Sequence, residues 1–383
     1  MRKCPYCDFN SHASQGTALP EQAYIAALTA DLEQDLPSVW GRTVSSIFIG
    51  GGTPSLFSPE SIDALLSNLR ARLPLQPELE ITLEANPGGI DAGKLSEFRA
   101  AGINRLSLGV QSFDDTLLAR LGRIHNSQDA LEAIAAIQTA GFDNWNLDLM
   151  FGLPGQELPQ ALQDIRIAMD CHPPHLSHYQ LTIEPNTRFA AQPPLLPSED
   201  VIWEMQQQCR QLLAEQHFAH YEISAYAQPQ RQCQHNLNYW HFGDYLGIGA
   251  GAHAKISDAG QGTISRRWKI KHPRDYLAHA GRPACIGGVQ PLQSADLVIE
   301  FMMNALRLSA GFPIDLFHRH TGLPIGIAAP ALQQAEQREL ILRDNHSIRP
   351  THRGQQFLNE LLGLFLPDDK ALARHIAIAP APP

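Results

Sequence analysis

The sequence predicts an α/β fold, an incomplete parallel (β/α)6 barrel followed by a winged-helix-like helical domain. From about residue 44, short β-branched or apolar runs alternate with longer helical patterns, which is typical of βα units around a parallel sheet. Six runs are expected to be strands, and no further pair closes the ring. They are residues 44–49, 79–84, 104–110, 145–150, 175–181 and 221–224.

The segments between these runs predict helices. Serine, aspartate or proline stands near several of their starts, and Gly102 and Gly141 follow two of their ends, as helix capping favours. The expected helices include residues 61–73, 94–101, 129–140, 158–169 and 199–216. Because the strand tips of a parallel barrel face one shared crevice, we expect the chemistry at the carboxyl ends of the strands.

A second, mainly helical unit is expected in the C-terminal part. Residues 339–350 predict two short strands about an Asp344-Asn345 turn, and residues 353–366 predict a helix. Many winged-helix-like modules bind DNA, but the acidic balance of this chain favours protein packing. The predicted division is a core over residues 1–230, a connecting region over 231–293, the C-terminal domain over 294–366 and a flexible tail over 367–383.

The composition excludes several classes of protein. A formal charge of -10 over 383 residues argues against nucleic-acid partners, which need a concentrated surplus of Lys and Arg. No window approaches the eighteen apolar residues of a membrane span, so at most peripheral membrane contact is expected. Six scattered cysteines are too few for a disulfide framework and, with no signal peptide expected, favour a reducing cytoplasm.

Cys4-Pro5-Tyr6-Cys7 is the first candidate for chemistry. Two thiols three residues apart can reach one metal or each other. A zinc site would require a second ligand pair nearby, and a thioredoxin-like redox pair belongs to a much smaller fold. Read alone, the pair is also compatible with two unremarkable cysteines.

Polar residues recur at the ends of successive predicted strands. Gly50-Gly51-Gly52-Thr53 follows the first strand, and glycines there let backbone N–H groups approach a ligand closely. Each position alone is compatible with a turn or a hydrogen-bonded structural residue. Their convergence on one rim indicates a site. The further positions are Glu84, Gln111, Arg123 and Asp148.

Taken together, these residues resemble the radical S-adenosylmethionine (SAM) proteins of the coproporphyrinogen oxidase family. The resemblance extends over most of residues 4–255, in the order and spacing of that family. In the family, a C-x-x-x-C-x-x-C loop holds a 4Fe-4S cluster through three thiolates and leaves one iron for SAM. The resemblance implies that Cys4 and Cys7 are the second and third of these ligands.

The resemblance also implies a role for each strand-end residue. Tyr6 is then the aromatic residue that lies over the cofactor, and Gly51, Gly52 and Thr53 lie along the methionine group of SAM. The remaining SAM contacts would be Glu84, Gln111, Arg123 and Asp148. Carboxylates can accept hydrogen bonds from an ammonium or a ribose hydroxyl, while Arg and Gln can hold a carboxylate or an amide.

One family position has no counterpart in this sequence. The first cysteine of the loop would lie four residues before Cys4, ahead of Met1, and the first strand of the barrel would precede it. Two thiolates hold an oxygen-labile cluster less well than three. The expectation is an N-terminally truncated or misassigned start, with an impaired copy as the alternative.

Two features separate the branches of this family. The oxidases have a further cysteine two residues after the third one, whereas this chain has Cys7-Asp8-Phe9. The segment from His235 to Trp240, H-N-L-N-Y-W, is similar to the H-N-x-x-Y-W pattern of the HemW-type heme chaperones. That resemblance implies heme binding, with His235 as axial ligand and Tyr239 and Trp240 against the porphyrin.

Two other residues near this segment, Cys233 and His253, are further candidates. Cys233 is the second choice of heme ligand, although a small buried thiol is its ordinary role. The glycine-rich stretch 245–253 lacks the Lys-Ser/Thr pair of a phosphate-binding loop, and it brings His253 into consideration near the barrel mouth.

The sequence therefore predicts a chaperone that binds heme and transfers it to an unidentified acceptor hemoprotein, carrying a 4Fe-4S cluster and SAM. Two alternatives remain open. One is an oxygen-independent coproporphyrinogen III oxidase, a radical SAM enzyme of porphyrin biosynthesis that decarboxylates its substrate oxidatively. The other is an inactive homologue without its cluster.

Overall fold

The structure, a computed structural model, describes residues 3–12 and 19–366. The chain forms two compact units. The first holds the N-terminal residues up to Thr29, Gly41–His220 and Ser224–Gln232, and the second holds Ala30–Trp40, Tyr221–Ile223 and the chain from Cys233 onward. Helix α1 (Glu21–Val39) contributes to both.

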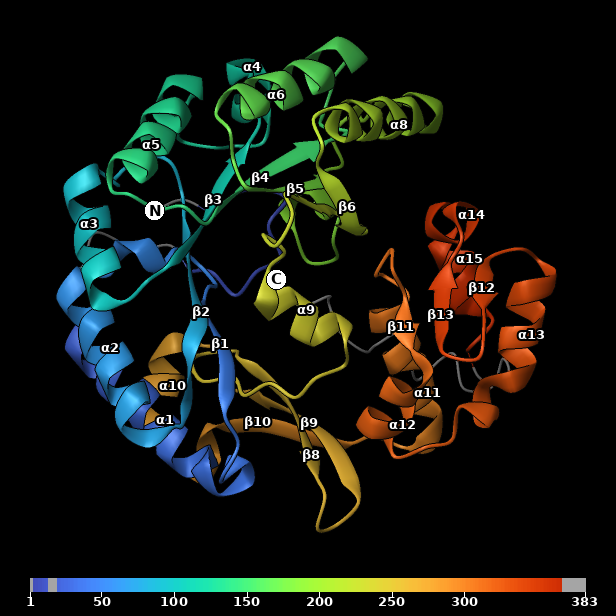
Figure 1. The fold of residues 1–383 in the computed structure, drawn as a ribbon. Helices are drawn as coiled ribbons and strands as arrows, with labels where there is room; N and C mark the ends of the chain where they lie inside the picture. Colours follow the sequence, from blue (N-terminus) through green and yellow to red (C-terminus); the bar gives the residue numbers. More distant parts are fainter. Residues whose placement is uncertain (1–2, 13–18, 367–383) are drawn as a thin grey trace. The chain divides into compact units, whose positions relative to one another are not determined.

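The first unit is built on a parallel sheet (Figure 1). Its five parallel strands adjoin in chain order, which confirms the expected open parallel barrel. Every residue of the central strand β3 is buried, as expected for a parallel sheet covered on both faces. The strands are β1 (Val44–Ile49), β2 (Leu75–Ala85), β3 (Arg105–Gln111), β4 (Trp145–Phe151) and β5 (His175–Gln180).

The predicted sixth strand, residues 221–224, is corrected by the structure. Two short strands occupy this region, β6 (Ala219–Glu222) and β7 (Ala225–Ala227), and β7 pairs antiparallel with β5. Only two residues separate β6 from β7, which permits a hairpin but not the long crossover that a parallel strand needs. The sheet therefore ends in the order β5-β7-β6.

Helices of the first unit lie along the outside of the sheet in Figure 1. Their starts are capped as the sequence predicted: the Asp91 side chain accepts from Lys94 N, and Asn126 forms a capping box with Asp129. The helices are α2 (Pro59–Arg72), α3 (Ala92–Ala101), α4 (Asp115–Arg120), α5 (Ser127–Thr139), α6 (Leu158–Asp170), α7 (Arg188–Ala191) and α8 (Glu199–Glu215), with the 3-10 turn η1 (Pro54–Leu56).

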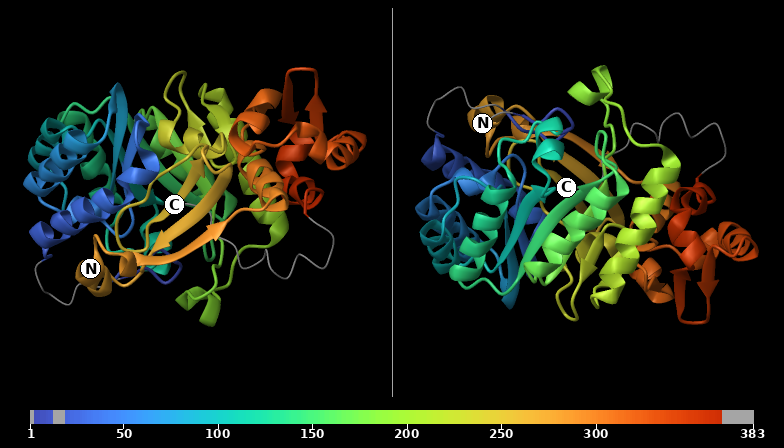
Figure 2. Two further views of the ribbon diagram at one scale, coloured as in Figure 1. Left: turned by 90° about the horizontal axis from the view of Figure 1, so that it is seen from below. Right: turned by 90° about the horizontal axis from the view of Figure 1, so that it is seen from above.

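The second unit contains an antiparallel sheet that the sequence analysis placed in a connecting region. Strands β8 (His253–Asp258), β9 (Thr263–Lys269) and β10 (Ile286–Pro291) pair in the order β10-β9-β8 and are drawn yellow to orange in Figure 2. Two glycines interrupt the alternation of apolar and polar residues by which β10 could have been predicted. Both lie against Trp268, where a Cβ would come within 2.9 Å of the ring at Gly287 and within 2.1 Å at Gly288. Helix α9 (Gln234–Trp240) precedes these strands in sequence, and helix α10 (Pro273–His279) and the 3-10 turn η2 (Pro283–Cys285) lie between β9 and β10.

A buried ion-pair cluster fixes the second half of α1 within this unit. Lys269 Nζ lies 2.5 Å from Asp31 Oδ1 and 2.7 Å from Asp35 Oδ2, and Tyr276 donates to Asp31 Oδ2 at 2.8 Å. All four side chains are buried. Removing one charge would leave another buried without its partner, which costs about 3–5 kcal/mol.

The C-terminal region has the predicted hairpin, β12 (Ile341–Arg343) and β13 (Ser347–Pro350), turned by Asp344. The predicted single helix over 353–366 is wrong, since α14 (His352–Gln356) and α15 (Leu358–Gly363) are separated at Phe357. The remaining elements are α11 (Ser294–Ala305), β11 (Phe312–Pro313), α12 (Ile314–Thr321), the 3-10 turn η3 (Ile325–Ala328) and α13 (Ala329–Gln337). The predicted tail, residues 367–383, lies outside the described residues.

A cluster of apolar side chains forms the core of the C-terminal helices. Phe301 is fully buried and meets Phe312 and Phe317 edge-on, both at centroid distances of 5.0 Å. Across residues 3–12 and 19–366, none of the helices has the length and apolarity required to cross a membrane.

Candidate functional site

The glycine turn after β1 is tied to the end of β2. Gly51 N donates to Glu84 Oε2 at 3.0 Å, and Asn86 Nδ2 donates to Thr53 Oγ1 at 3.0 Å. Gly50 has no room for a side chain, because a Cβ there would lie 2.9 Å from Glu84 Oε2. Gly51 has a φ of 120°, which a residue with a side chain rarely adopts. The turn therefore presents backbone and carboxylate groups side by side.

Arg123 links the end of β2 to the N-terminal cysteine segment. Its Nη2 donates to Asn86 Oδ1 at 2.6 Å and to the carbonyl oxygen of Gly109 at 2.5 Å, while its Nη1 lies 4.0 Å from Cys4 Sγ. A Cβ on Gly109 would come within 3.0–3.5 Å of the Gln111, Asn86 and Arg123 side chains. The absence of a side chain at Gly109 thus leaves the space in which these three polar groups converge.

The segment from Cys4 to Cys7 is a tight turn held against the first unit. Cys7 N donates to Cys4 O at 3.2 Å, and Phe189 N donates to Pro5 O at 3.0 Å. Gly122 packs against Pro5, where a Cβ would lie 2.7 Å from Pro5 Cδ. Both cysteines are free and partly buried, and the Cys4 thiol lies beside Arg123.

Gln111 and Tyr179 are joined by a hydrogen bond. Gln111 ends β3 with a φ of 73°, an unusual conformation for a residue other than glycine, and Tyr179 OH donates to its Oε1 at 2.8 Å. Asp164 on α6 fixes the next two residues, accepting from Ser112 Oγ at 2.8 Å and from Phe113 N at 2.7 Å. Neighbouring structure therefore holds Gln111 in its left-handed conformation.

Asp148 lies on β4 within a polar cluster. Ser107 Oγ donates to Asp148 Oδ2 at 3.1 Å, and Asn146 Nδ2 donates to Asp148 Oδ1 at 2.8 Å. Burial raises the pKa of the Asp148 carboxyl, although hydrogen bonds from Asn146 and neighbouring serines act in the opposite direction.

Burial also shifts the pKa values of Glu84, Tyr6 and Cys7. It raises the pKa of Glu84 to about 7, with the nearby negative charge of Asp148 adding to the rise and the Gly51 N–H opposing it. It raises the pKa of Tyr6 to about 12 and also raises the pKa of the Cys7 thiol. A cationic ligand beside Glu84 would lower the pKa of that carboxyl and favour its ionised form.

The structure joins five of the sequence-predicted residues of the first unit. Contacts connect Cys4 to Arg123, Arg123 through Asn86 to Thr53, and Gly51 to Glu84. Asp148 instead lies within β4 and is hydrogen-bonded to Ser107 and Asn146. Two further residues belong to the set: Asn86, which directly follows β2, and Tyr179, whose place within a strand resembled that of an ordinary core aromatic.

The segment containing His235 forms helix α9 in the second unit. The His235 ring meets the Tyr239 ring edge-on, at 4.8 Å between centroids and 89° between planes. Trp240 is not available to pack against a ligand, because it is 7% exposed and Arg307 lies over its ring at 4.3 Å. Cys233 is 1% exposed, in keeping with an ordinary buried thiol. His253 lies on β8, where its ring stacks at 6.4 Å from Trp268.

The thiols of the first unit fit a 4Fe-4S cluster in part. Cys4 and Cys7 supply two thiols at the spacing that cluster-binding loops use. In the part of the chain that the structure describes, no group of three or more His, Cys, Asp or Glu side chains could hold a metal ion. The described residues therefore fit two of the three protein ligands of such a cluster.

Comparisons with known proteins give the family. A family model for the Radical SAM superfamily matches residues 1–166, and one for the HemN C-terminal domain matches residues 292–357. The chain is 47% identical over 366 residues to the heme chaperone HemW of Escherichia coli, covering 96% of this chain and 95% of that protein. The chain belongs to the HemW family. The heme chaperone HemW of Haemophilus influenzae is likewise 47% identical over 373 residues, with 96% of each chain covered.

A solved structure shares the fold of this HemW family member. Coproporphyrinogen III oxidase (HemN) of Escherichia coli, described as a radical SAM enzyme, superposes with a TM-score of 0.79 over 95% of this chain and 87% of that one, at 22% identity. The match confirms the radical SAM barrel with a HemN-type C-terminal domain. The Radical SAM region, residues 1–166, contains the cysteine turn and every strand-end residue predicted from the sequence.

Proposed function

We propose that this HemW family member is a heme chaperone that binds heme through His235 and passes it to an acceptor hemoprotein. The observation that carries the proposal is the placement of His235 on α9, partly buried and edge-on to Tyr239. Proteins 47% identical to this chain over 96% of its length are heme chaperones. A neutral imidazole is a common axial ligand of heme iron, and an aromatic neighbour restricts its rotation.

We assign the first unit to a 4Fe-4S cluster and SAM. Cys4 and Cys7 would hold two of the irons, and Arg123 beside Cys4 would counter the negative charge of the thiolates. When bound, the cluster supplies one-electron chemistry and an open iron for SAM. The described residues contribute two of the thiolates, so the third ligand is not assigned.

The strand-end groups match the polar parts of SAM. The backbone N–H groups of Gly52 and Thr53 suit its carboxylate, while the Gly51 N–H donates to Glu84, whose carboxylate suits its ammonium. Gln111 and Asp148 offer an amide and a carboxylate for the remaining donors and acceptors. Tyr6 packs beside the apolar cluster formed by Leu117 and its neighbours and would cover the cofactor from the side of the cysteine turn.

We infer a cytoplasmic setting and a protein partner. All six cysteines, each in a described segment, are free, which suits a reducing compartment. Transfer requires an acceptor whose apo form binds heme more tightly than this chain does, because the binding free energy of heme must be more favourable on the acceptor.

A transfer assay tests the proposal. The protein is loaded with heme, mixed with an apo-hemoprotein of distinct absorption spectrum, and followed by visible absorbance. We expect heme to move to the acceptor, and the variant His235→Ala to take up less heme at the loading step. His318→Ala, at an exposed histidine on α12, is the matched control and should load as the parent does. Heme that stays on the protein against a tight apo-acceptor would contradict the chaperone role.

The oxidase alternative is tested separately. Anaerobically reconstituted protein is supplied with SAM, a reductant and coproporphyrinogen III, and carbon dioxide release is measured. The chaperone proposal predicts no turnover. Decarboxylation at a rate comparable to that of an authentic oxidase would favour the enzyme instead.

A further inference from the structure

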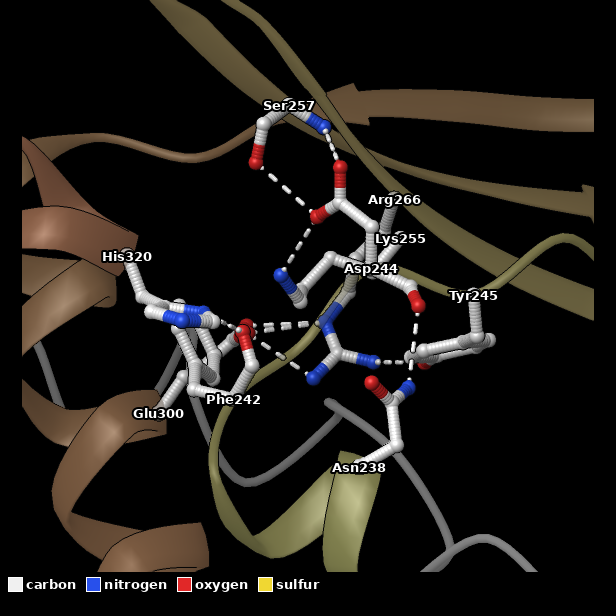
Figure 3. A network of polar contacts seen from close by, with 9 residues as sticks. All are labelled: Asn238, Phe242, Asp244, Tyr245, Lys255, Ser257, Arg266, Glu300 and His320. Atoms are coloured by element: carbon white, nitrogen blue, oxygen red, sulfur yellow. Dashed lines mark hydrogen bonds and ion pairs between the residues drawn. The ribbon is translucent and has the colours of Figure 1, made fainter. Parts of the chain in front are cut away.

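A chain of aromatic and charged side chains runs from His235 into the C-terminal domain, entirely within the second unit. Figure 3 shows the part of it from Tyr245 to Glu300. The chain of side chains begins with the rings. His235 meets Tyr239 edge-on, and Tyr239 meets Tyr245 edge-on at 4.5 Å and 71°. Edge-to-face contacts of this kind restrict ring rotation. The orientation of the His235 imidazole thus depends on Tyr245 through one intervening ring.

Tyr245 is fixed by both its backbone and its side chain. Its backbone pairs with that of Lys255 on β8, with both N–H to O distances at 3.0 Å. Its hydroxyl accepts from Arg266 Nη1 at 3.3 Å. The ring that supports Tyr239 is therefore held at its Cα end and at its hydroxyl end.

Arg266 is in turn held by Glu300 of α11. Its Nε donates to both Glu300 oxygens, at 2.9 Å and 3.0 Å, and its Nη2 donates to Glu300 Oε2 at 2.8 Å. Glu300 is 6% exposed. A planar guanidinium bound in this way has little freedom to rotate, so α11 sets the position of the Tyr245 hydroxyl.

The loop from α9 to β8 is held by contacts with α9, β8 and α12. Asn238 Nδ2 donates to the carbonyl oxygen of Asp244 at 2.9 Å, and the Asp244 carboxylate accepts from Lys255 Nζ at 2.9 Å. His320 Nδ1 of α12 lies 3.0 Å from the carbonyl oxygen of Phe242. Two helices of the C-terminal domain, α11 and α12, thus support the segment that carries His235 (Figure 3).

We propose that Glu300, Arg266 and Tyr245 are positioning residues that orient His235 through Tyr239, so that the C-terminal domain serves as the support of the heme-ligating helix. The inference rests on the proposed function, because it takes His235 as the axial ligand. An imidazole already held in its binding orientation loses less rotational freedom when it binds iron. Residues that orient a metal ligand in this way typically account for about 10–100-fold in metal affinity.

The test uses the full chain and ferric heme. Tyr245→Leu removes the ring that contacts Tyr239, and Tyr245→Phe removes only the hydroxyl. Glu300→Gln weakens the hydrogen bonds that hold Arg266. Tyr276→Phe is the matched control, because it also removes a buried tyrosine hydroxyl of the second unit, the one bonded to Asp31, without touching the ring chain. Heme affinity is measured by absorbance titration, ligand orientation by electron paramagnetic resonance of the ferric complex, and folding by thermal unfolding.

We expect Tyr245→Leu and Glu300→Gln to lower heme affinity about 10-fold or more and to broaden the ferric resonance signal. Tyr245→Phe should show a smaller change in both, and Tyr276→Phe should match the parent. Added imidazole should restore the parent absorption spectrum of Tyr245→Leu without raising its melting temperature, which a purely structural defect would not show. Should Glu300→Gln fail to fold, the comparison of the two Tyr→Phe variants decides.

His235→Ala distinguishes the role of His235 as axial ligand from the role of Glu300, Arg266 and Tyr245 in positioning it. If it keeps the spectrum and affinity of the parent, the axial ligand is misassigned and the positioning role falls with it. If it loses the imidazole-bound spectrum while Tyr245→Leu, Tyr245→Phe and Glu300→Gln keep it together with the parent affinity, only the positioning role is overturned.

Discussion

Arg123 lies 4.0 Å from Cys4, measured from Nη1 to Sγ, while its other terminal nitrogen donates to Asn86 at 2.6 Å. One guanidinium therefore connects the N-terminal cysteine turn with the strand-end residues. The contact joins segments 119 residues apart in sequence. It is the point at which the proposed cluster ligands and the proposed SAM contacts become one site.

Arg123→Gln should weaken SAM binding. The change removes a charge-assisted hydrogen bond and a positive charge beside the cysteines, which corresponds to about 1.5–3 kcal/mol, or about 10–150-fold in affinity. Isothermal titration of SAM into anaerobically reconstituted protein measures the effect. Arg120→Gln is the control, because Arg120 also donates to backbone carbonyl oxygens, those of Pro154 and Gly155, but does not contact the cysteine turn. Equal SAM affinity in parent and Arg123→Gln would remove Arg123 from the site.

Glu84→Gln should make the protein more stable at pH 8 and change its stability little at pH 4. The folded-state pKa of Glu84 is raised to about 7, so the folded protein binds more protons than the unfolded chain between about pH 4.5 and 7. The contribution of this group to stability therefore falls as the pH rises through that window. The glutamine has no charge to bury, and the difference at pH 8 should be on the order of 2–3 kcal/mol.

Urea unfolding at pH 4, 6 and 8 measures this difference. Glu132→Gln on α5, at an exposed position, is the control and should shift stability by less than about 0.5 kcal/mol at each pH. A Glu84→Gln variant that is less stable than the parent at pH 8 would show that the ionised carboxylate is favourable in the folded state.

Gly50→Ala should reduce SAM affinity and also lower stability. Its Cβ would lie 2.9 Å from Glu84 Oε2 and 2.9 Å from the Phe48 ring, so both the carboxylate and the ring must move. Overpacking of this kind should cost about 1–3 kcal/mol. Gly326→Ala is the control, since nothing lies within 4 Å of a Cβ there. Unchanged SAM affinity in Gly50→Ala would mean that the position of Glu84 is unimportant for binding.

Arg307→Leu should destabilise the second unit. Arg307 pairs with Glu222 at 3.3 Å and covers Trp240 at 4.3 Å, and Glu222 is only 3% exposed. Breaking this buried ion pair should cost about 3–5 kcal/mol, and the removal of the charge over the indole should change tryptophan fluorescence.

Urea unfolding of Arg307→Leu measures the loss. The exposed pair between Arg343 and Glu336, at 2.6 Å, supplies the control, and Arg343→Leu should cost less than about 1 kcal/mol. Similar losses in the two variants would show that burial does not strengthen the first pair.

The parallel half-barrel was predictable because each strand and helix shows its own periodicity and its own caps. β1 has the predicted bounds, residues 44–49, and the Asp344 hairpin lies where turn chemistry places it. The antiparallel sheet β8–β10 was missed because Gly287 and Gly288 interrupt the alternation of apolar and polar residues in β10. Both positions pack against Trp268 and leave no room for a side chain. The break between α14 and α15 was missed as well, because Phe357, where they separate, is not a helix-breaking residue.

The strand-end residues of the site were predictable for a similar reason. Glu84, Gln111 and Asp148 lie on strands whose position the sequence indicates, and the barrel topology brings their tips together. Tyr179 and Arg266 were not predictable, since their roles depend on partners 68 and 34 residues away, Gln111 and Glu300. The contact of Arg307 with Trp240 also joins residues far apart in sequence. Because Arg307 lies over the Trp240 ring, the expectation that this indole packs against heme is wrong.

Resonance Raman spectroscopy of the ferrous heme complex tests most directly whether His235 binds the heme iron. Excitation in the main heme absorption band reveals the iron–imidazole stretching vibration of a histidine-bound heme. We expect this band in the parent protein and its loss in His235→Ala, with recovery when imidazole is added. A band that persists unchanged in His235→Ala would show that another residue binds the iron and that α9 is not the heme-ligating helix.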